Sequence, residues 1–530
     1  MNSKPSQPQR QIWSSKIGII MAVAGSAIGL GNFLRFPVQA VSNGGGAFMI
    51  PYFVSLFLMG IPLMWVEWTI GRYGGGFGHG TGPGAFHSMW AKNRFIKYFG
   101  LIGIFGPMVI FIYYTYIESW LLGYSLFSIT GKYMTLNSQE SMQGFLSAYQ
   151  GVQKNEHFGS ILTAYIFFLI TFVCNMYVIK QGITKGIERF TKWAMPVLLI
   201  AGVILAIRIL TLQPMHINHL DWTAWNGMGF LWNLDLSQLL NAKIWLAASG
   251  QIFFTLSVGI GSVLTYASYL KKQDDIVLSG LASVSTNQFA EVILGSSIII
   301  PATFLFFGPL QTQEIAASGA FNLGFVTMPM IFQEIAFGQI FGTLWFGLLF
   351  LAGVTSSISL AQPAITFLED EFDLSQKKAC HIFGIVSFAL CHFPIFFLAK
   401  GVVGEMDFWG GTFCLVMFGT VEAILFAWVF GMDKAWGEMH QGSDIRIPYF
   451  YKFIIKYVTP TFLIVILGAW IIQQGLPTLL MEGVADAQKP YILATRIGLL
   501  SLMGVLAVLV NKAWKRRNRL GKMPNYISSE

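Results

Sequence analysis

The sequence predicts an all-α polytopic membrane protein with twelve transmembrane helices. Hydrophobic residues make up 54% of the 530 positions and charged residues only 11%. The mean hydropathy of +0.60 is too high for a soluble globular protein. Apolar windows of about 20 residues, the length that crosses a bilayer, recur along the whole chain. Two of these windows are interrupted by glycine and polar residues.

Each apolar window is expected to form one span. The windows lie at residues 17–36, 47–66, 98–122, 158–179, 193–211, 244–270, 276–307, 339–368, 380–398, 408–432, 453–472 and 491–511. An even number of spans places both termini on the same side of the membrane.

The basic residues indicate which side that is. Most of the 33 Lys and Arg residues fall in segments that share a side with the N-terminus, among them the tail "KAWKRRNRLGK". Because positive loops stay in the cytoplasm, we expect a multi-pass protein of the cell inner (plasma) membrane with both termini cytoplasmic. The basic groups flank apolar segments, so the net charge of +8 does not indicate a nucleic-acid partner. The outer loops lack N-x-S/T sequons and cysteine pairs, which favours a bacterial protein.

Two spans carry breaks at corresponding positions. The first span contains "GSAIGLGN" at residues 25–32, and the sixth contains "SVGIG" at residues 257–261. Non-helical backbone survives at membrane depth only where protein or a polar cavity satisfies its amides and carbonyls. Broken spans at matching positions of two halves are typical of transporters that bind substrate between inverted repeats. Glycine can instead serve close helix packing, so a single break would leave both interpretations open.

Six segments carry a family resemblance. They are "GSAIGLGNFLRFPVQAVSNGGGAFMIPY", "YYTYIESW", "GQIFFTLSVGIGSVLTYASY", "NQFAEVILG", "AGVTSSISLAQP" and "FLEDE". They resemble signature motifs of the neurotransmitter:sodium symporter family, most closely its bacterial leucine-transporting members, from Arg10 to the last spans. The resemblance implies the LeuT fold, with a 5+5 inverted repeat, unwound helices 1 and 6, and sodium-driven uptake by alternating access.

On this fold the chain divides into five parts. The expected parts are a cytoplasmic N-terminal segment (1–16), a first repeat with spans 1–5 (17–211), a second repeat with spans 6–10 (212–434), spans 11 and 12 (435–511) and a basic cytoplasmic tail (512–530). The lipid bilayer therefore surrounds most of the chain.

Unwound helices suit sodium ions. Sodium is a hard cation that takes oxygen ligands, and a broken helix exposes carbonyls that a continuous helix would use itself. The resemblance implies two sodium sites. The first would use the carbonyl of Ala27, the side chains of Asn32, Thr255 and Asn287, and the carboxylate of the substrate. The second would use the carbonyls of Gly25, Ile28 and Ala352 and the hydroxyls of Thr355 and Ser356. Such hydroxyls could also bond back to their own helix.

The same resemblance implies a small-molecule amino-acid substrate. Free amides suit its carboxylate, and carbonyls at a half-helix C-terminus suit its ammonium. The carboxylate would meet the amides of Gly29 and Gly31 and the hydroxyl of Tyr114. The ammonium would meet carbonyls around Ala27, Phe254 and Thr255 and the hydroxyl of Ser257. The side chain would lie among Ile110, Tyr114, Phe254, Ile260, Ser356 and Leu360. Monoamine-transporting relatives carry Asp at the position of Gly29, so a glycine indicates a substrate with its own carboxylate.

Charged residues near the first break imply gates. The resemblance pairs Arg35 with Asp407 across the outer vestibule, although an arginine there could also reach toward lipid headgroups. On the cytoplasmic side the implied gate residues are Arg10, Trp13, Tyr269 and Asp370. Three further acids inside spans are expected to make structural hydrogen bonds, namely Glu67, Glu118 and Glu422.

Glu291 has a separate expected role. It lies four residues after Asn287 and therefore on the same helix face. Chloride-dependent relatives carry serine at the matching position, so a carboxylate there would supply the anion's charge from the protein itself. Its expected neighbours include Tyr52, Gln251 and Thr255. A purely structural acid is the alternative.

These features predict sodium-coupled symport of small to medium apolar amino acids, of the Leu, Ile, Val, Met or Ala class. A non-transporting amino-acid sensor on the same fold would have the same sequence, and only flux distinguishes the two. A channel would need a continuous polar pore. An enzyme is not expected, because the histidines are scattered and neither H-E-x-x-H nor G-x-S-x-G occurs. A homodimer is left open.

Overall fold

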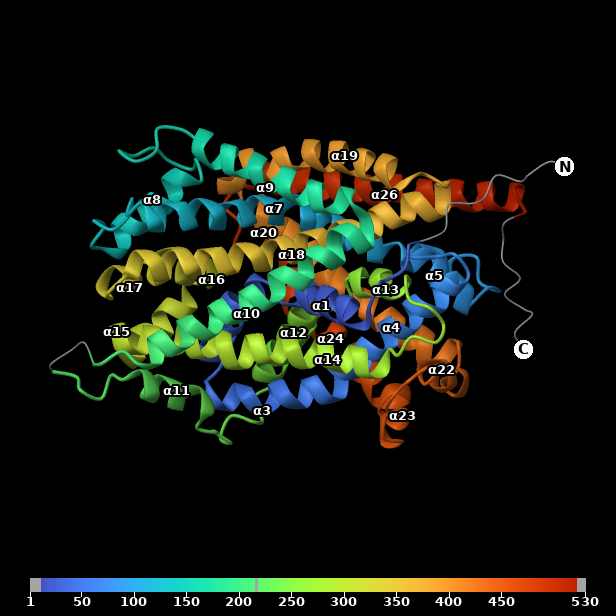
Figure 1. Ribbon diagram of the computed structural model, residues 1–530, viewed down its shortest axis with the longest axis horizontal. Helices are drawn as coiled ribbons and strands as arrows, with labels where there is room; N and C mark the ends of the chain where they lie inside the picture. The colour runs from blue at the N-terminus through green and yellow to red at the C-terminus, as the bar shows by residue number, and fades with distance from the viewer. Residues whose placement is uncertain (1–10, 215–217, 522–530) are drawn as a thin grey trace.

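Long apolar helices run roughly along the longest axis of the molecule (Figure 1). The computed structural model describes residues 11–214 and 218–521. Within these ranges ten helices are long and apolar enough to span a membrane. In chain order they are Gly46–Gly76 (α3, Gly46–Ser55, and α4, Ile61–Gly76), Ile96–Ile129 (ending in α7, Ile102–Ile129), α9 (Leu162–Lys180), Ile183–Leu210 (ending in α10, Arg189–Leu210), Val277–Ala317 (α14, Val277–Gln288, to α15, Ser296–Ala317), α18 (Gly338–Phe372), α19 (Gln376–Phe396), Val402–Val429 (α20, Val402–Met406, and α21, Cys414–Ile424), Phe450–Leu479 (with α24, Thr459–Trp470) and α26 (Lys489–Arg519).

Two predicted spans are built from shorter helices. The first combines α1 (Lys16–Ala27) with Gly31–Ser42, which ends in α2 (Phe36–Ser42), and the pair is bent by 49°. The sixth consists of α12 (Ala242–Leu256) and α13 (Ser262–Ala267). The described residues thus contain ten spans, or eleven with the bent pair. The predicted number of twelve is reached only when α12 and α13 are taken as one span.

The first break follows from where α1 stops. Ile28 has an extended backbone (φ −77°, ψ 104°), and its amide donates to Ala24 at 2.7 Å as the last bond of the helix. Helical structure returns around Leu30, first as a π-helix at Gly31–Arg35 and then as α2. The carbonyls of the last turn of α1 therefore lack the amide partners that a continuous helix would supply.

The second break depends on glycine. Ser257 adopts a left-handed conformation (φ 52°), and Gly259 and Gly261 follow with φ values of 76° and 90°. A Cβ atom on Gly259 would lie 2.3 Å from the Leu415 carbonyl oxygen, and one on Gly261 would lie 2.5 Å from the Gly103 oxygen. Both positions therefore exclude a side chain by conformation and by space.

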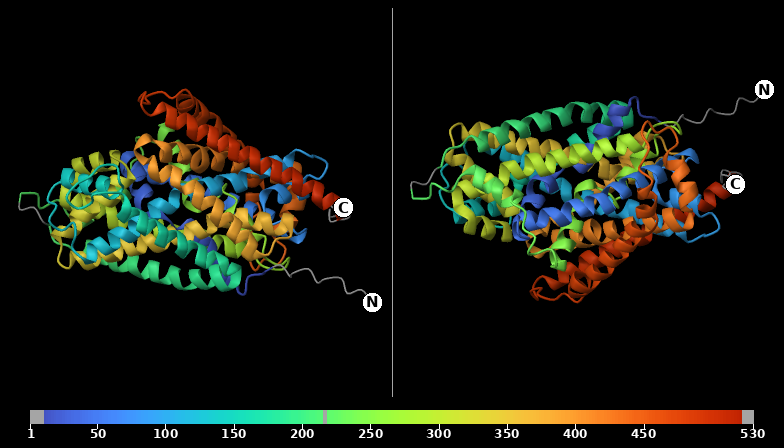
Figure 2. Two further views of the ribbon diagram at one scale, coloured as in Figure 1. Left: turned by 90° about the horizontal axis from the view of Figure 1, so that it is seen from above. Right: turned by 90° about the horizontal axis from the view of Figure 1, so that it is seen from below.

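The broken helices pack against a frame of continuous ones. α7 and α18 lie along each other, and α1 packs against α10, α14 and α18. The C-terminal part of the chain protrudes on one flank (Figure 2), where α24 packs against α21 and α26 packs against α20. Figure 1 places α8 (Gln139–Tyr149), α11 (Ala224–Trp232) and α17 (Met328–Glu334) at one end, which we call the loop end. The opposite end holds α5 (Gly82–Met89) and the Arg-rich last turn of α26, and we call it the basic end.

Candidate functional site

The two breaks meet inside the bundle. The hydroxyl of Ser257, just after α12, donates to the carbonyl oxygen of Ser26 in α1 at 2.9 Å. The hydroxyl of Ser356 on α18 reaches the same carbonyl at 3.4 Å. Three segments that are distant in the sequence therefore converge on the free C-terminal end of α1.

A small cavity of about 60 Å³ lies at this meeting point. The predicted substrate-binding residues that line it are Ala27, Gly29, Gly31, Ile110, Tyr114, Phe254, Ser257, Ile260, Ser356 and Leu360. Thr255 is the one predicted binding residue that does not line it. The structure thus places all but one of the predicted substrate-binding residues around a single cavity.

Two glycines bring backbone to the edge of the cavity. A Cβ atom on Gly29 would lie 2.9 Å from Ser356 Oγ and 3.4 Å from the Tyr114 hydroxyl oxygen. A Cβ atom on Gly31 would lie 2.5 Å from the ring of Phe254. Any side chain at these positions would fill space that the cavity walls now share.

Side-chain oxygens converge beside the first break. Asn32 donates through Nδ2 to Thr255 Oγ1 at 3.0 Å and to Asn287 Oδ1 at 2.8 Å, and its own Oδ1 accepts from the Gly29 amide at 2.8 Å. Asn287 donates to Thr255 Oγ1 at 3.0 Å. All three side chains are buried. The predicted side-chain ligands of the first sodium site therefore form one cluster.

Glu291 adjoins this oxygen cluster. Its carboxylate accepts from Gln251 Nε2 at 2.6 Å, from Asn287 Nδ2 at 3.4 Å and from the Thr255 hydroxyl. Tyr52, the fourth expected neighbour, also interacts with this carboxylate and donates a hydrogen bond to an adjacent glutamine at 2.8 Å. Glu291 is fully buried, and among the described residues no Lys or Arg lies within ion-pair distance of it.

A second group of oxygens lies where α1 faces α18. A Cβ atom on Gly25 would lie 3.2 Å from Thr355 Cβ, so the two helices are in close contact. The Thr355 hydroxyl donates to the Ala352 carbonyl in its own helix at 3.0 Å. The extended residue Ile28 follows the end of α1. The predicted ligands of the second sodium site therefore lie at or next to this contact.

Phe254 and Arg35 close the cavity toward the loop end. Arg35 Cζ lies 4.3 Å from the centroid of the Phe254 ring. Asp407 accepts a hydrogen bond from the Tyr113 hydroxyl at 2.6 Å. Within the described residues Arg35 and Asp407 form no direct ion pair, which differs from the predicted gate. A vestibule of about 590 Å³, lined in part by Arg35, Phe254 and Trp470, lies on the loop-end side of this closure.

Contacts of Trp13 close the path from the cavity to the basic end. Trp13 donates to the Tyr266 carbonyl at 2.9 Å and packs edge-on against the Tyr266 ring. Tyr269 and Asp370, the expected partners, form hydrogen bonds of 2.8 Å with Thr366 and with a backbone amide, respectively. Arg10 lies outside the described residues. Trp13 therefore contacts Tyr266, in the same segment that carries the predicted gate residue Tyr269.

Glu188 holds the start of α1. Its carboxylate accepts from the Ser14 amide at 2.9 Å, from the Ser14 hydroxyl at 2.6 Å and from the Ser15 hydroxyl at 2.9 Å. Lys192 pairs with the same carboxylate at 2.7 Å. A Cβ atom on Gly18 would lie 2.1 Å from Glu188 Oε1, so α1 begins directly against this residue.

The three other buried acids differ in their surroundings. Glu67 accepts from the Gly259 amide in the second break. Glu118 accepts from the Ser357 hydroxyl at 2.5 Å. Glu422 faces Glu67, and neither of its carboxyl oxygens has a hydrogen-bond donor within the described part of the chain. The expected structural hydrogen bonds are present for Glu67 and Glu118, and Glu422 lies against Glu67.

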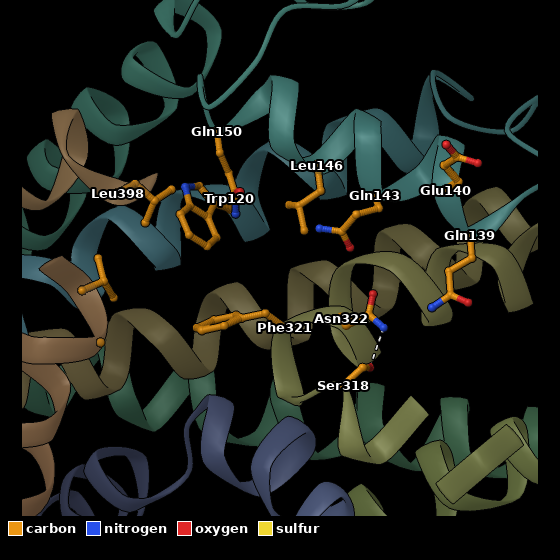
Figure 3. Close-up of a pocket in the computed structure, with 12 residues that line it drawn as sticks. Trp120, Gln139, Glu140, Gln143, Leu146, Gln150, Ser318, Phe321, Asn322 and Leu398 are labelled. Carbon is orange, nitrogen blue, oxygen red and sulfur yellow. Dashed lines mark hydrogen bonds between the residues drawn. The ribbon is translucent and has the colours of Figure 1, made fainter. Parts of the chain in front are cut away.

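A larger depression of about 900 Å³ lies at the loop end, between α7, α8, α16 (Ala320–Asn322) and α20 (Figure 3). Its walls include Trp120, Phe321 and Gln143, and Asn322 donates to Ser318 at 2.6 Å. No residue of either helix break lines it. The smaller cavity is therefore the candidate functional site, because residues of both helix breaks line it.

Six residues that line the cavity were not among the predicted binding residues, namely Ser26, Leu30, Tyr113, Ser359, Gly411 and Leu415. Ser359 lines it and lies 2.7 Å from the Ser26 hydroxyl, oxygen to oxygen. Its spacing of three from Ser356 places it on the same helix face, a signal that could have identified it. Tyr113 and Leu415 also line the cavity, and Leu415 reaches it only because Gly259 lets α21 approach.

The fold and this site define a class of protein. Two broken helices that enclose a cavity between continuous helices are the arrangement of a secondary transporter. The profile of the sodium:neurotransmitter symporter family matches residues 10–142 and 141–515. The chain belongs to this family and is a sodium-dependent transporter of the multi-pass membrane type.

Named relatives agree with this assignment. An uncharacterized sodium-dependent transporter of Methanocaldococcus jannaschii is 29% identical over 463 residues, covering 86% of this chain and 90% of the relative. A similar transporter of Bacillus subtilis is 28% identical over 468 residues, covering 86% of this chain and 96% of the relative. The crystal structure of MhsT in complex with L-phenylalanine matches with a TM-score of 0.73 and 27% identity, over 86% of this chain and 99% of that chain. The predicted family, the LeuT-type helical fold and the prediction of a transporter rather than an enzyme are confirmed.

Proposed function

We propose that this chain couples sodium entry to the uptake of small to medium apolar amino acids, of the Leu, Ile, Val, Met or Ala class, by alternating access. The observation that best supports this is the cavity between the two breaks, where free backbone and side-chain oxygens meet. MhsT was solved with L-phenylalanine, which is also an apolar amino acid.

The first proposed sodium ion binds at Asn32, Thr255 and Asn287. The mutual contacts of 2.8–3.0 Å keep their polar atoms close enough for one ion to reach all three. The Ala27 carbonyl, at the open end of α1, and the substrate carboxylate complete the set. Because the substrate is itself a ligand, sodium and amino acid raise each other's affinity by the same factor.

The second proposed sodium ion binds between α1 and α18. Carbonyl oxygens of Gly25, Ile28 and Ala352 and the hydroxyls of Thr355 and Ser356 supply oxygen ligands. The close approach at Gly25 supports this assignment. An ion here would hold the two helices together, since its ligands come from both.

The substrate carboxylate is proposed to face the amides of Gly29 and Gly31 and the hydroxyl of Tyr114. The ammonium faces the carbonyl end of α1 and the Ser257 hydroxyl, which already donates to that end. The side chain then lies toward the branched aliphatic residues on the cavity wall, namely Ile110, Ile260 and Leu360. These aliphatic residues favour substrates with aliphatic side chains, because burial of apolar surface drives binding.

Alternating access is proposed to use the two closures around the cavity. Arg35, Phe254 and Asp407 form the closure toward the loop end, and Trp13 with Tyr266 forms part of the closure toward the basic end. The vestibule above Phe254 supplies the entry path. Substrate release requires the basic end to open.

We also propose that the basic end is cytoplasmic and that the membrane is a bacterial inner membrane. The Arg-rich last turn of α26 supports this orientation. Protease added outside intact cells should leave the C-terminal tail uncut, and cleavage of the tail under these conditions would reverse the orientation.

The decisive experiment is a flux measurement in proteoliposomes. We expect leucine-class substrates to accumulate when sodium is present on the substrate's side and to stop accumulating when potassium replaces it. A panel of the twenty amino acids as competitors then ranks the substrates. Affinity that is equal in sodium and potassium contradicts the coupling, and sodium-dependent binding without flux identifies the protein as a sensor.

A further inference from the structure

A groove lies on the outer flank of the bundle, between α9 and α19. The two helices contact each other and lie side by side along one edge of the molecule (Figure 1). The groove has a volume of about 450 Å³ and is lined by Phe172, Val173, Met176, Tyr177, Lys180, Cys380, His381, Gly384, Ile385 and Phe388. It shares no residue with the cavity at the helix breaks.

The walls of this groove face the surroundings of the protein rather than its core. Val173, Tyr177 and Ile385 are 64%, 68% and 72% exposed. In a membrane-spanning bundle, apolar side chains this exposed on the outer flank lie against lipid. The groove is therefore filled by lipid chains or by another apolar partner.

Glycine forms the floor of the groove. Gly384 on α19 lies opposite Met176 on α9, and a Cβ atom on it would come within 2.9 Å of the Met176 methyl carbon. Phe172 and Phe388 close the far end, with ring centroids 5.2 Å apart. A larger residue at position 384 would occupy the hollow.

The length of the groove matches one leaflet. From Lys180 to Phe172 the helix advances by eight residues, or about 12 Å at about 1.5 Å per residue. Half of a hydrocarbon core of about 30 Å is about 15 Å. The groove therefore accommodates a chain that enters from one face of the membrane and ends near the midplane.

Basic residues lie at the open end of the groove. Lys180 is the last residue of α9, and His381 lies in the second turn of α19, after the exposed Lys377 and Lys378. Within the described residues none of these side chains has an ion-pair partner. Glu369 is the acidic residue that interacts electrostatically with Cys380 in this region. The three lysines therefore outnumber this acid.

We propose that this groove binds one acyl chain of an anionic glycerophospholipid, with the phosphate at Lys180 and His381. Basic pockets between transmembrane helices favour anionic headgroups by charge, and the apolar hollow behind them takes the chain. The site lies at the basic end and thus in the cytoplasmic leaflet of the proposed orientation. It does not depend on the proposed substrate.

The test is lipid retention measured by native mass spectrometry on the purified full-length protein, exchanged into mixed micelles of phosphatidylglycerol and phosphatidylcholine. The wild type should retain phosphatidylglycerol in preference to phosphatidylcholine. Lys180→Gln should weaken phosphatidylglycerol retention about fivefold, the effect of one cation at a membrane surface. The control Lys272→Gln removes an exposed lysine that does not line the groove and should change nothing.

A second pair of variants tests the hollow itself. Gly384→Leu should reduce retention of the anionic lipid by a similar factor, because its side chain fills the floor. Gly498→Leu is the matched control, since Gly498 is exposed on α26 with no atom near its Cβ position. Equal retention in Gly384→Leu and Gly498→Leu, or no preference for the anionic lipid, overturns the proposal. A protein dimer that Gly384→Leu dissociates would assign the groove to a second copy of the chain and also overturns it.

Discussion

At the scale of single residues, Gly29 is the sharpest test of how the substrate binds. In Gly29→Asp the new side chain points toward Ser356 and Tyr114, where the substrate carboxylate is proposed to lie. Two like charges a few ångströms apart in a poorly solvated site repel strongly. Amino-acid uptake should fall by about tenfold or more, the ratio for a loss of about 1.4 kcal/mol.

The control for Gly29→Asp is Gly437→Asp, at an exposed glycine with no atom near its Cβ position. This variant adds the same charge far from the cavity and should transport normally. Wild-type affinity for leucine in Gly29→Asp would move the substrate carboxylate elsewhere.

Glu291 carries a second prediction at this scale. Its buried carboxylate borders the cluster of Asn287 and Thr255, so it compensates the charge of the proposed sodium ions. The wild type should therefore transport equally in chloride and in gluconate. Glu291→Ser should lose activity in gluconate and regain part of it in chloride, because the anion replaces the missing charge. A chloride requirement in the wild type, or a serine variant indifferent to chloride, would falsify this account.

The residues of the cavity were largely predictable because they belong to long sequence motifs. Ser257 and Gly29 lie in such motifs, and the structure places both at the cavity. The arrangement of charged side chains was less predictable. Arg35 stacks on Phe254, and Asp407 bonds to Tyr113, because side-chain partners depend on distances between helices that no local pattern specifies.

At the scale of elements, the break after α12 should fail when its glycines are replaced. In Gly259→Ala the backbone is held at a φ of 76°, which costs a non-glycine residue roughly 1–2 kcal/mol. The Cβ would also meet the Leu415 carbonyl at 2.3 Å. The melting temperature and sodium-driven uptake should both fall.

Gly250→Ala, in the regular part of α12 with open space at its Cβ position, is the comparison for Gly259→Ala. There alanine should leave stability unchanged or raise it by up to about 1 kcal/mol, since it favours helix over glycine. Equal melting temperatures in the two variants would show that the break does not require glycine.

Hydrophobic windows predicted the continuous helices well. The window at 339–368 corresponds to α18, and the window at 491–511 lies within α26. The sixth window did not yield a span of its own, because residues 257–261 leave α12 and α13 as two short helices. Hydropathy measures apolar length, whereas a break is decided by glycine conformation and by contacts with α21.

At the scale of the whole molecule, transport requires the basic end to open. Opening must separate α1 from Glu188, which accepts from both Ser14 and Ser15. Glu188→Gln removes the charge, and hydrogen bonds to a charged group stabilise by about 1.5–3 kcal/mol, so the basic end should open more often. A cysteine introduced at Thr366, near Tyr269, should then be labelled faster from that side.

The matched control for Glu188→Gln is Lys192→Gln. It removes the ion pair with Glu188 but leaves the serine contacts in place. Labelling at position 366 should therefore change less in Lys192→Gln than in Glu188→Gln. Equal labelling in the wild type and in Glu188→Gln would mean that this contact does not hold the basic end closed.

The contacts of Glu188 also bear on how the protein behaves in the cold. Opening must break the hydrogen bonds that Ser14 and Ser15 donate to this carboxylate, so we expect it to carry a substantial activation enthalpy. Cooling should slow turnover far more than it weakens sodium or substrate binding. At low temperature the wild type should keep sodium and amino acid bound and release them only slowly. Uptake by Glu188→Gln should depend less on temperature and give a flatter Arrhenius plot. Cooling would thus leave a protein that still binds sodium and amino acid but hardly transports them.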